Sequence, residues 1–168
     1  AWFFSELYKR YGEVPVLDKV LQISDNLQLP RNTEAEVLKF ITDDCDLAAS
    51  LLLPVNNTVN TGRATKGAAL MLKARTLLYA ASLLHNPAND AAKWKQAADA
   101  AKAVIDLDVY QVDGDYNGLF HKRNTPNVIF QSTVNNTTWL KQMFVPSQNG
   151  LAWIQPLQNL VDDYEMKN

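Results

Sequence analysis

Hydrophobic side chains recur every three or four positions over most of the first 107 residues, which is the spacing of amphipathic helices. The first such pattern runs from Trp2 to Tyr8 and stops at Gly12, a residue that commonly ends a helix. Residues 17–32 then lack a regular pattern, so an irregular segment is expected there.

The second helical pattern begins at Thr33, and Glu36 follows at the spacing of a capping box. In that arrangement the Thr hydroxyl and the Glu carboxylate each satisfy a free backbone N–H at the helix start. Apolar residues continue at helical spacing as far as Leu52, and Pro54 is expected to end the helix.

Two further helices are predicted over residues 65–84 and 90–106. The first is apolar or small on nearly all sides, which is typical of a helix surrounded by other helices. In the second, Trp94 is expected to be a core residue, on a packing face with the following side chains: Ala97, Ala98, Ala101, Val104 and Ile105. The pattern thus predicts a mainly α-helical bundle over residues 1–107.

Residues 108–168 are expected to form a more irregular, loop-rich part. A short β-prone run at 128–134 precedes a polar turn at 135–138, and a last helix is predicted over 156–166. The whole chain is interpreted as one partial domain with these two portions.

Net charge and cysteine content exclude several classes of function. Sixteen basic and eighteen acidic side chains give a net charge of −2, so no basic field exists to attract nucleic acid. The single cysteine, Cys45, excludes an internal disulfide, and no zinc-ligand spacing is present. We therefore expect no metal and no cofactor.

Two near-matches to ligand-binding motifs are interpreted as structural. Residues 62–67 have GxxxxG spacing, but Ala68 and Ala69 replace the Lys and Ser/Thr of a phosphate-binding loop. A helix start with Thr65 as cap, and Gly67 allowing tight packing, is the preferred interpretation. Residues 113–118 resemble the first half of a calcium loop, but Asn124 replaces its glutamate.

No catalytic residues are predicted. The chain has no GxSxG nucleophile motif. A glycosidase using Asp162 or Glu165 is the remaining enzymatic alternative, although no spacing selects a pair of carboxylates.

Aromatic and amide side chains in the C-terminal part suit a neutral polar ligand. Indole rings stack on the apolar faces of sugars, and amides bind sugar hydroxyls. The candidate ligand-binding residues are Trp139, Trp153, Asn136, Gln148 and Asn149. Either tryptophan alone is also compatible with a core position.

Several short motifs follow one another in a fixed order along nearly the whole chain. They are Tyr11-Gly12-x-Val14-Pro15, Pro30-Arg31-Asn32-Thr33, Gly62-Arg63-Ala64-Thr65-Lys66-Gly67-Ala68-Ala69, Lys73-Ala74-Arg75, Val128-Ile129-Phe130, and Leu160-Val161-Asp162-x-Tyr164-Glu165-Met166. In this order they resemble the SusD/RagB family of outer-membrane glycan-binding lipoproteins.

The resemblance implies tetratricopeptide-like helix pairs with an irregular ligand-binding part. It also implies a lipoprotein on the outer face of the outer membrane of Bacteroidetes, which passes oligosaccharides to a SusC-like TonB-dependent transporter during polysaccharide utilization. Family members are several times longer, so the lipid anchor and signal are expected outside this chain.

The function expected is therefore non-catalytic binding of oligosaccharides, such as starch-like glycans, for uptake. The alternative is a helical scaffold that binds a protein or peptide partner along the faces of the helices at 33–53, 65–84 and 90–106.

Overall fold

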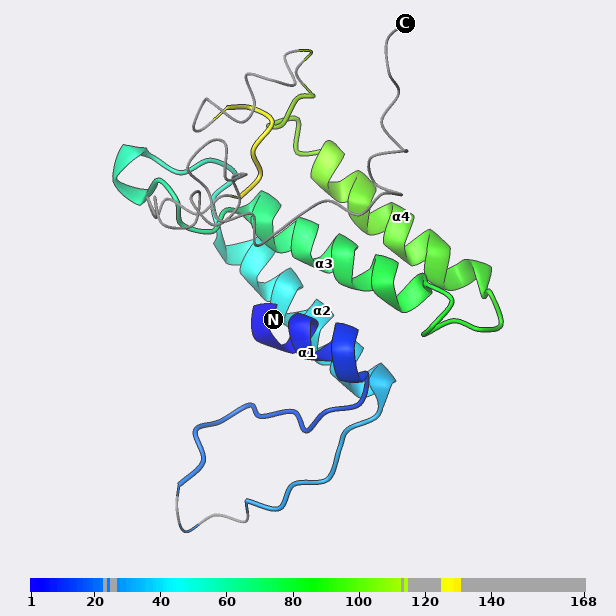
Figure 1. Ribbon diagram of the computed structural model, residues 1–168. Helices are drawn as coiled ribbons and strands as arrows, with labels where there is room; N and C mark the ends of the chain where they lie inside the picture. Colours follow the sequence, from blue (N-terminus) through cyan, green and yellow to red (C-terminus); the bar gives the residue numbers. More distant parts are fainter. Residues whose placement is uncertain (23, 25–26, 113, 115–124, 131–168) are drawn as a thin grey trace, which may run out of the picture. The chain divides into compact units, whose positions relative to one another are not determined.

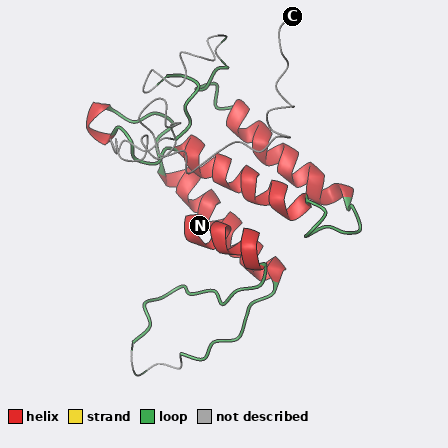
Figure 2. Cartoon of the chain, in the orientation of Figure 1, coloured by secondary structure: helices red, strands yellow, loops and turns green. Residues whose placement is uncertain are grey.

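Helices dominate the part of the chain that the computed structural model describes, namely residues 1–22, 24, 27–112, 114 and 125–130. The chain divides into two compact units, Ala1–Gln131 and Ser132–Asn168, and all described residues lie in the first. The elements are α1 (Trp2–Tyr11), α2 (Glu34–Leu51), the 3₁₀-helix η1 (Thr58–Asn60), α3 (Lys66–Ala81) and α4 (Ala91–Ile105). No strand occurs within the described ranges, and the predicted mainly α-helical class is confirmed (Figure 2).

The start of α2 follows the predicted capping box. The backbone N–H of Thr33 donates to the Glu36 carboxylate at 2.9 Å, and the Glu36 N–H donates to the Thr33 hydroxyl at 3.3 Å. The hydrogen bond from the Thr33 backbone, followed by one from the Asn32 side-chain amide at 3.2 Å, lowers the pKa of Glu36. At the other end α2 stops at Leu51, three residues before Pro54.

A long connection joins α1 to α2, and its two ends are held together. α1 ends at Tyr11, and Gly12 follows with a positive φ of 63°, as predicted. The Asn32 N–H donates to the Val14 carbonyl at 3.1 Å, and the Val16 N–H donates to the Asn32 side-chain oxygen at 2.9 Å. The ends of the connection are thereby held beside each other ahead of α2 (Figure 1).

Helix α3 lies between its neighbours and contacts α1, α2 and α4 (Figure 1). Its contact with α4 contains mostly small side chains: Ala74 packs with Ala97 and Ala100, and Leu77 belongs to the same cluster. The helix ends at Ala81, which is earlier than the predicted residue 84. The Ser82 hydroxyl donates to the Tyr79 carbonyl at 2.5 Å, which satisfies a helix-end carbonyl locally.

The packing face predicted for α4 was partly wrong. Trp94 is 42 % exposed rather than a core residue, and its indole N–H donates to the Asn89 side chain at 2.9 Å. Ala98, Ala101 and Ile105 are also exposed. The buried residues are Ala97, Ala100 and Val104, because α4 turns one narrow small-residue stripe toward α3.

The main core lies between α1, α2 and α3. Tyr8, Val37, Ile41, Cys45 and Ala80 are each at most 2 % exposed and belong to one cluster. Burial raises the pKa of the Cys45 thiol to about 11 and is the largest of the causes that act on it.

We expect Cys45 to react very slowly with a disulfide reagent in the folded protein. A thiol with a pKa near 11 is only about one part in a thousand thiolate at about pH 8, and the thiolate is the reactive form. The reagent releases a coloured thiol as it reacts with Cys45, and the rise in absorbance of that product measures the rate. Rapid reaction without denaturant would contradict the buried position, whereas rapid reaction after denaturation is the expected control.

Of the predictions for the C-terminal part, the β-prone run is wrong where it is described, and the others remain untested. The β-prone run at 128–134 forms no strand in its described residues 128–130, of which 129 and 130 form a bend instead. These residues have no strand partner among the described residues, and Val128 instead donates a turn hydrogen bond to the Thr125 carbonyl at 2.9 Å. The helix predicted at 156–166, the turn at 135–138 and the calcium-like segment's aspartates lie outside the described residues. The division of the domain at residue 107 stays a prediction.

Candidate functional site

The five residues predicted from the sequence to bind ligand lie outside the described residues. They are Trp139, Trp153, Asn136, Gln148 and Asn149. Asp162 and Glu165, which the enzymatic alternative would use, lie outside them too. These assignments therefore stay predictions, and the site described below was not predicted.

A pocket of about 340 Å³ opens where three segments meet near the start of α3. One segment is the α2–α3 connection that contains η1, the second follows α4, and the third is the 125–130 stretch, yellow in Figure 1. The lining residues are Pro54, Val55, Asn56, Thr61, Gly62, Arg63, Thr65, Val109, Tyr110, Thr125, Pro126, Val128, Ile129 and Phe130. This volume lies at the small end of the range found for small-molecule sites.

Tyr110 is placed in the pocket by the start of α3. Its hydroxyl lies 3.2 Å from the Thr65 hydroxyl, and its ring rests on Gly67. A Cβ atom on Gly67 would come within 2.1 Å of the Tyr110 hydroxyl oxygen and 2.5 Å of ring atom Cε2. Gly67 is therefore required by the close approach of an aromatic ring.

The GxxxxG block thus has the structural role that the sequence favoured. The Thr65 hydroxyl accepts a hydrogen bond from the Ala68 N–H at 3.3 Å, which makes Thr65 the N-cap of α3. Gly62 has a positive φ of 85°, a conformation that glycine adopts without strain. Both glycines are explained by backbone geometry.

The connection before α3 is held by its own polar groups. The Asn56 amide donates to the Arg63 carbonyl at 2.9 Å, and the Arg63 N–H donates to the Asn60 carbonyl at 3.1 Å. The Lys66 N–H donates to the Leu53 carbonyl at 2.9 Å. These bonds fix the position of Arg63 on the pocket wall.

The pocket combines an apolar wall with separate polar groups. Valine, isoleucine, proline and phenylalanine side chains supply the wall, whereas amide, hydroxyl and guanidinium groups supply hydrogen bonds. The Oγ1 atom of Thr125 is buried and has no hydrogen-bond partner within the described part of the chain. Such a surface suits a ligand with apolar faces and several hydroxyl groups.

Sequence reasoning missed Tyr110 as a site residue. The signal that could have found it is Gly67, since a glycine in the first turn of a helix indicates close approach by another group. The identity of that group could not be read from the sequence, because Tyr110 lies 43 positions further along the chain.

A second polar cluster joins α1, the start of α2 and the segment that follows α3. The ring of Tyr8 stacks on His85 with centroids 4.8 Å apart, and His85 Nδ1 lies 3.2 Å from a Glu34 carboxylate oxygen. Burial, followed by the nearby Glu34 charge, raises the pKa of Tyr8 to about 12. None of these residues lines the pocket, and the cluster is structural.

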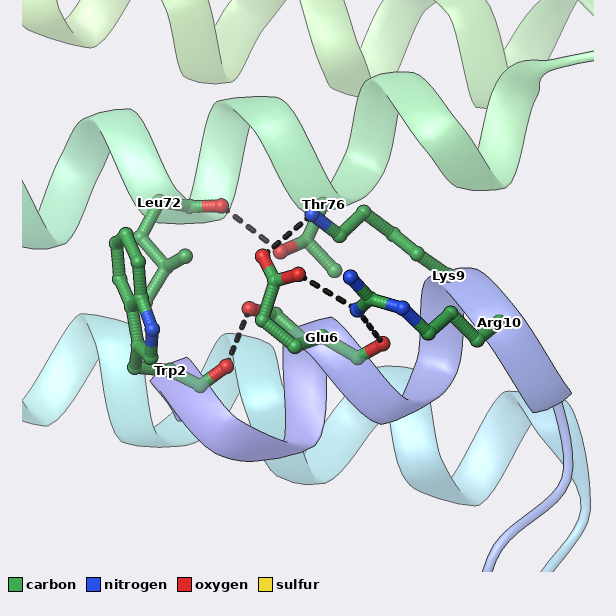
Figure 3. Close-up of polar contacts among 7 residues, drawn as sticks. Trp2, Glu6, Lys9, Arg10, Leu72 and Thr76 are labelled. Atoms are coloured by element: carbon green, nitrogen blue, oxygen red, sulfur yellow. Dashed lines mark hydrogen bonds and ion pairs between the residues drawn. The ribbon is translucent and has the colours of Figure 1, made fainter. Parts of the chain in front are cut away.

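A third group of charges lies between α1 and α3 (Figure 3). Glu6 accepts a hydrogen bond from Lys9 and pairs with Arg10 at 2.8 Å. The hydrogen bond from Lys9, followed by that from Arg10, lowers the pKa of Glu6. Lys9 also lies over the Tyr79 ring, 5.2 Å from its centroid, so the group connects α1 to α3.

The acidic residues of α2 have separate partners. Asp43 pairs with Lys39 at 2.6 Å, and Asp46 pairs with Lys73 at 2.6 Å. Among the described side chains, no group of three or more His, Cys, Asp or Glu residues is arranged to hold a metal ion. No helix within the described ranges has the length and hydrophobicity that crossing a bilayer requires.

Comparison with known proteins places this architecture in a class. No family model and no curated protein matches the chain. A solved SusD-like protein from Bacteroides fragilis matches 98 % of the chain at 28 % identity and a TM-score of 0.79. A SusD-like carbohydrate binding protein from the same organism matches 96 % at 21 % identity, also with a TM-score of 0.79, and supports the fold alone.

These matches confirm the resemblance found in the sequence: the chain is SusD-like in fold over nearly its whole length. The helices are of the tetratricopeptide-like kind expected of that class. The chain spans 33 % and 31 % of the lengths of the two solved proteins.

Proposed function

We propose that the protein binds oligosaccharides without catalysis and delivers them to a SusC-like TonB-dependent transporter at the cell surface. The SusD-like fold carries this proposal together with the motif resemblance to the SusD/RagB glycan-binding lipoproteins, and one of the two matched structures is described as a carbohydrate binding protein. The site would belong to a surface lipoprotein of the outer membrane.

The chemistry of the described pocket supports binding rather than turnover. Its wall offers a tyrosine, a phenylalanine, hydroxyls and an amide, and no carboxylate is among the described residues that line it. Hydrolysis of a glycosidic bond ordinarily requires two carboxyl groups at a defined separation. Aromatic rings and amides suffice for reversible capture of a sugar.

The predicted tryptophans belong to the same proposal. Trp139 and Trp153 would stack on sugar rings, and Asn136, Gln148 and Asn149 would bind their hydroxyls. The expected mechanism is capture by a few stacked rings followed by transfer on contact with the transporter.

Alanine at Trp139 or Trp153 is expected to weaken glycan binding about tenfold or more, because each indole would lose its stacking contact with a sugar. The measurement is calorimetric titration with the tightest binder from a panel of neutral and acidic oligosaccharides. Trp94→Ala is the matched control, since Trp94 is an exposed indole on α4 that does not line the pocket. Unchanged affinity in both variants would remove these residues from the site.

A helical scaffold that binds a protein or peptide is the second candidate. Phe3, Leu7 and Tyr11 follow one another at intervals of four residues, so they lie on one face of α1. They are 82 %, 39 % and 64 % exposed, respectively. An exposed apolar face of this kind suits a protein partner. Co-purification of a protein, together with no binding to any glycan, would favour the scaffold.

A further inference from the structure

Arg63 is the only charged side chain among the described residues that line the pocket. Given the proposed glycan binding, on which this inference rests, we propose that the pocket takes a sugar residue that carries an anionic substituent. The substituent, a carboxylate or a sulfate, would bind the Arg63 guanidinium, and the sugar ring would lie against the apolar wall.

Among the described residues, Arg63 has no acidic partner. Several basic side chains on the helices are paired, as Arg10 is with Glu6 at 2.8 Å and Lys73 with Asp46 at 2.6 Å. In the described part of the chain, by contrast, no ion pair involves Arg63, and no Asp or Glu lines the pocket with it. An anion entering the pocket would meet a free cation and no repelling carboxylate.

The α2–α3 connection holds the backbone of Arg63 in place. Its carbonyl accepts from the Asn56 amide at 2.9 Å, its N–H donates to the Asn60 carbonyl at 3.1 Å, and Gly62 turns the backbone just before it. The backbone from which the guanidinium projects is therefore fixed before a ligand arrives. A planar guanidinium matches the two oxygens of a carboxylate or sulfate, which a lysine cannot do equally well.

The rest of the pocket suits a sugar ring better than a simple anion. About 340 Å³ is far more space than a free carboxylate or sulfate needs. Val109, Val128 and Phe130 offer an apolar surface to the C–H face of the ring.

The test is calorimetric titration of the protein with trigalacturonate, a sulfated galactan oligosaccharide and a neutral galactose trisaccharide. At low salt we expect at least one of the acidic ligands to bind at least about tenfold tighter than the neutral one, and added salt to reduce that preference. The two acidic probes show whether carboxylate or sulfate is the better substituent.

Arg63→Gln is expected to abolish the preference for the acidic ligand, and Arg63→Lys to retain only part of it. Arg31→Gln is the matched control, because Arg31 is an exposed arginine that does not line the pocket. Circular dichroism checks that each variant remains helical.

Three results would overturn the inference: equal affinity for neutral and acidic ligands, a preference that survives Arg63→Gln, or a preference that Arg31→Gln removes to the same extent. Each leaves the proposed glycan binding intact as long as some oligosaccharide binds. If no oligosaccharide binds the unmodified protein, the proposed function fails and this inference fails with it.

Discussion

Replacing Ile41 with alanine is expected to lower the free energy of unfolding by about 2–5 kcal/mol. Ile41 is 0 % exposed and lies in the cluster that joins α1, α2 and α3, so the substitution would remove buried methyl groups and leave a cavity. Denaturant unfolding followed by circular dichroism measures the change. Ile41→Val removes one methylene group and should cost only about 0.5–1.5 kcal/mol.

Leu47→Ala is the control on the same helix. Leu47 is 60 % exposed, and a substitution at such a position usually changes stability by less than about 0.5 kcal/mol. A loss at Leu47 as large as the loss at Ile41 would contradict the assignment of the core.

Replacing Gly67 with alanine is expected to destabilise the protein by about 1–3 kcal/mol and to displace Tyr110 from the pocket. The new Cβ would come within 2.1 Å of the Tyr110 hydroxyl oxygen and 2.6 Å of ring atom Cζ, so the ring must move. Its contact with the Thr65 hydroxyl at 3.2 Å would then be lost. Alanine ordinarily stabilises a helix relative to glycine, so a net loss would identify the clash as the cause.

Two further variants isolate this effect. Gly114→Ala should be nearly neutral, because a Cβ atom there meets nothing within 4 Å. In a double-mutant cycle, Tyr110→Ala should remove the penalty of Gly67→Ala, since the two residues are in contact. A Gly67→Ala variant as stable as the unmodified protein would show that Tyr110 does not pack on Gly67 as described.

Local signals in the sequence predicted the helices well. Thr33 and Glu36 mark the start of α2, Gly12 follows the end of α1, and Asp90 and Asp106 flank α4. Each of these depends on residues close together in the chain, where capping chemistry determines the outcome.

Signals that depend on tertiary contacts were harder to interpret. An apolar flank made of Trp94, Ala98, Ala101 and Ile105 adjoins the buried stripe of α4. Helical spacing therefore could not show that Ala97 and Ala100 are buried while Trp94 and Ile105 are exposed. The pocket was missed for the same reason. It depends on Tyr110 and the 125–130 stretch meeting the loop before α3, and these contacts span 45 or more positions.

The family resemblance contributed what periodicity could not. The order of short motifs identified the SusD-like class, and the solved structures confirm it at 28 % identity over 98 % of the chain. The motifs did not identify the residues that contact glycan. Trp139 and Trp153 were selected on chemical grounds alone.

Binding of the protein to a glycan array, displaying neutral and acidic oligosaccharides, tests the central claim most directly. The account predicts selective signals on a subset of the glycans, with every bound glycan recovered at its original length. An array without any signal, or one on which the glycans are shortened, would contradict a protein that captures sugars without cleaving them.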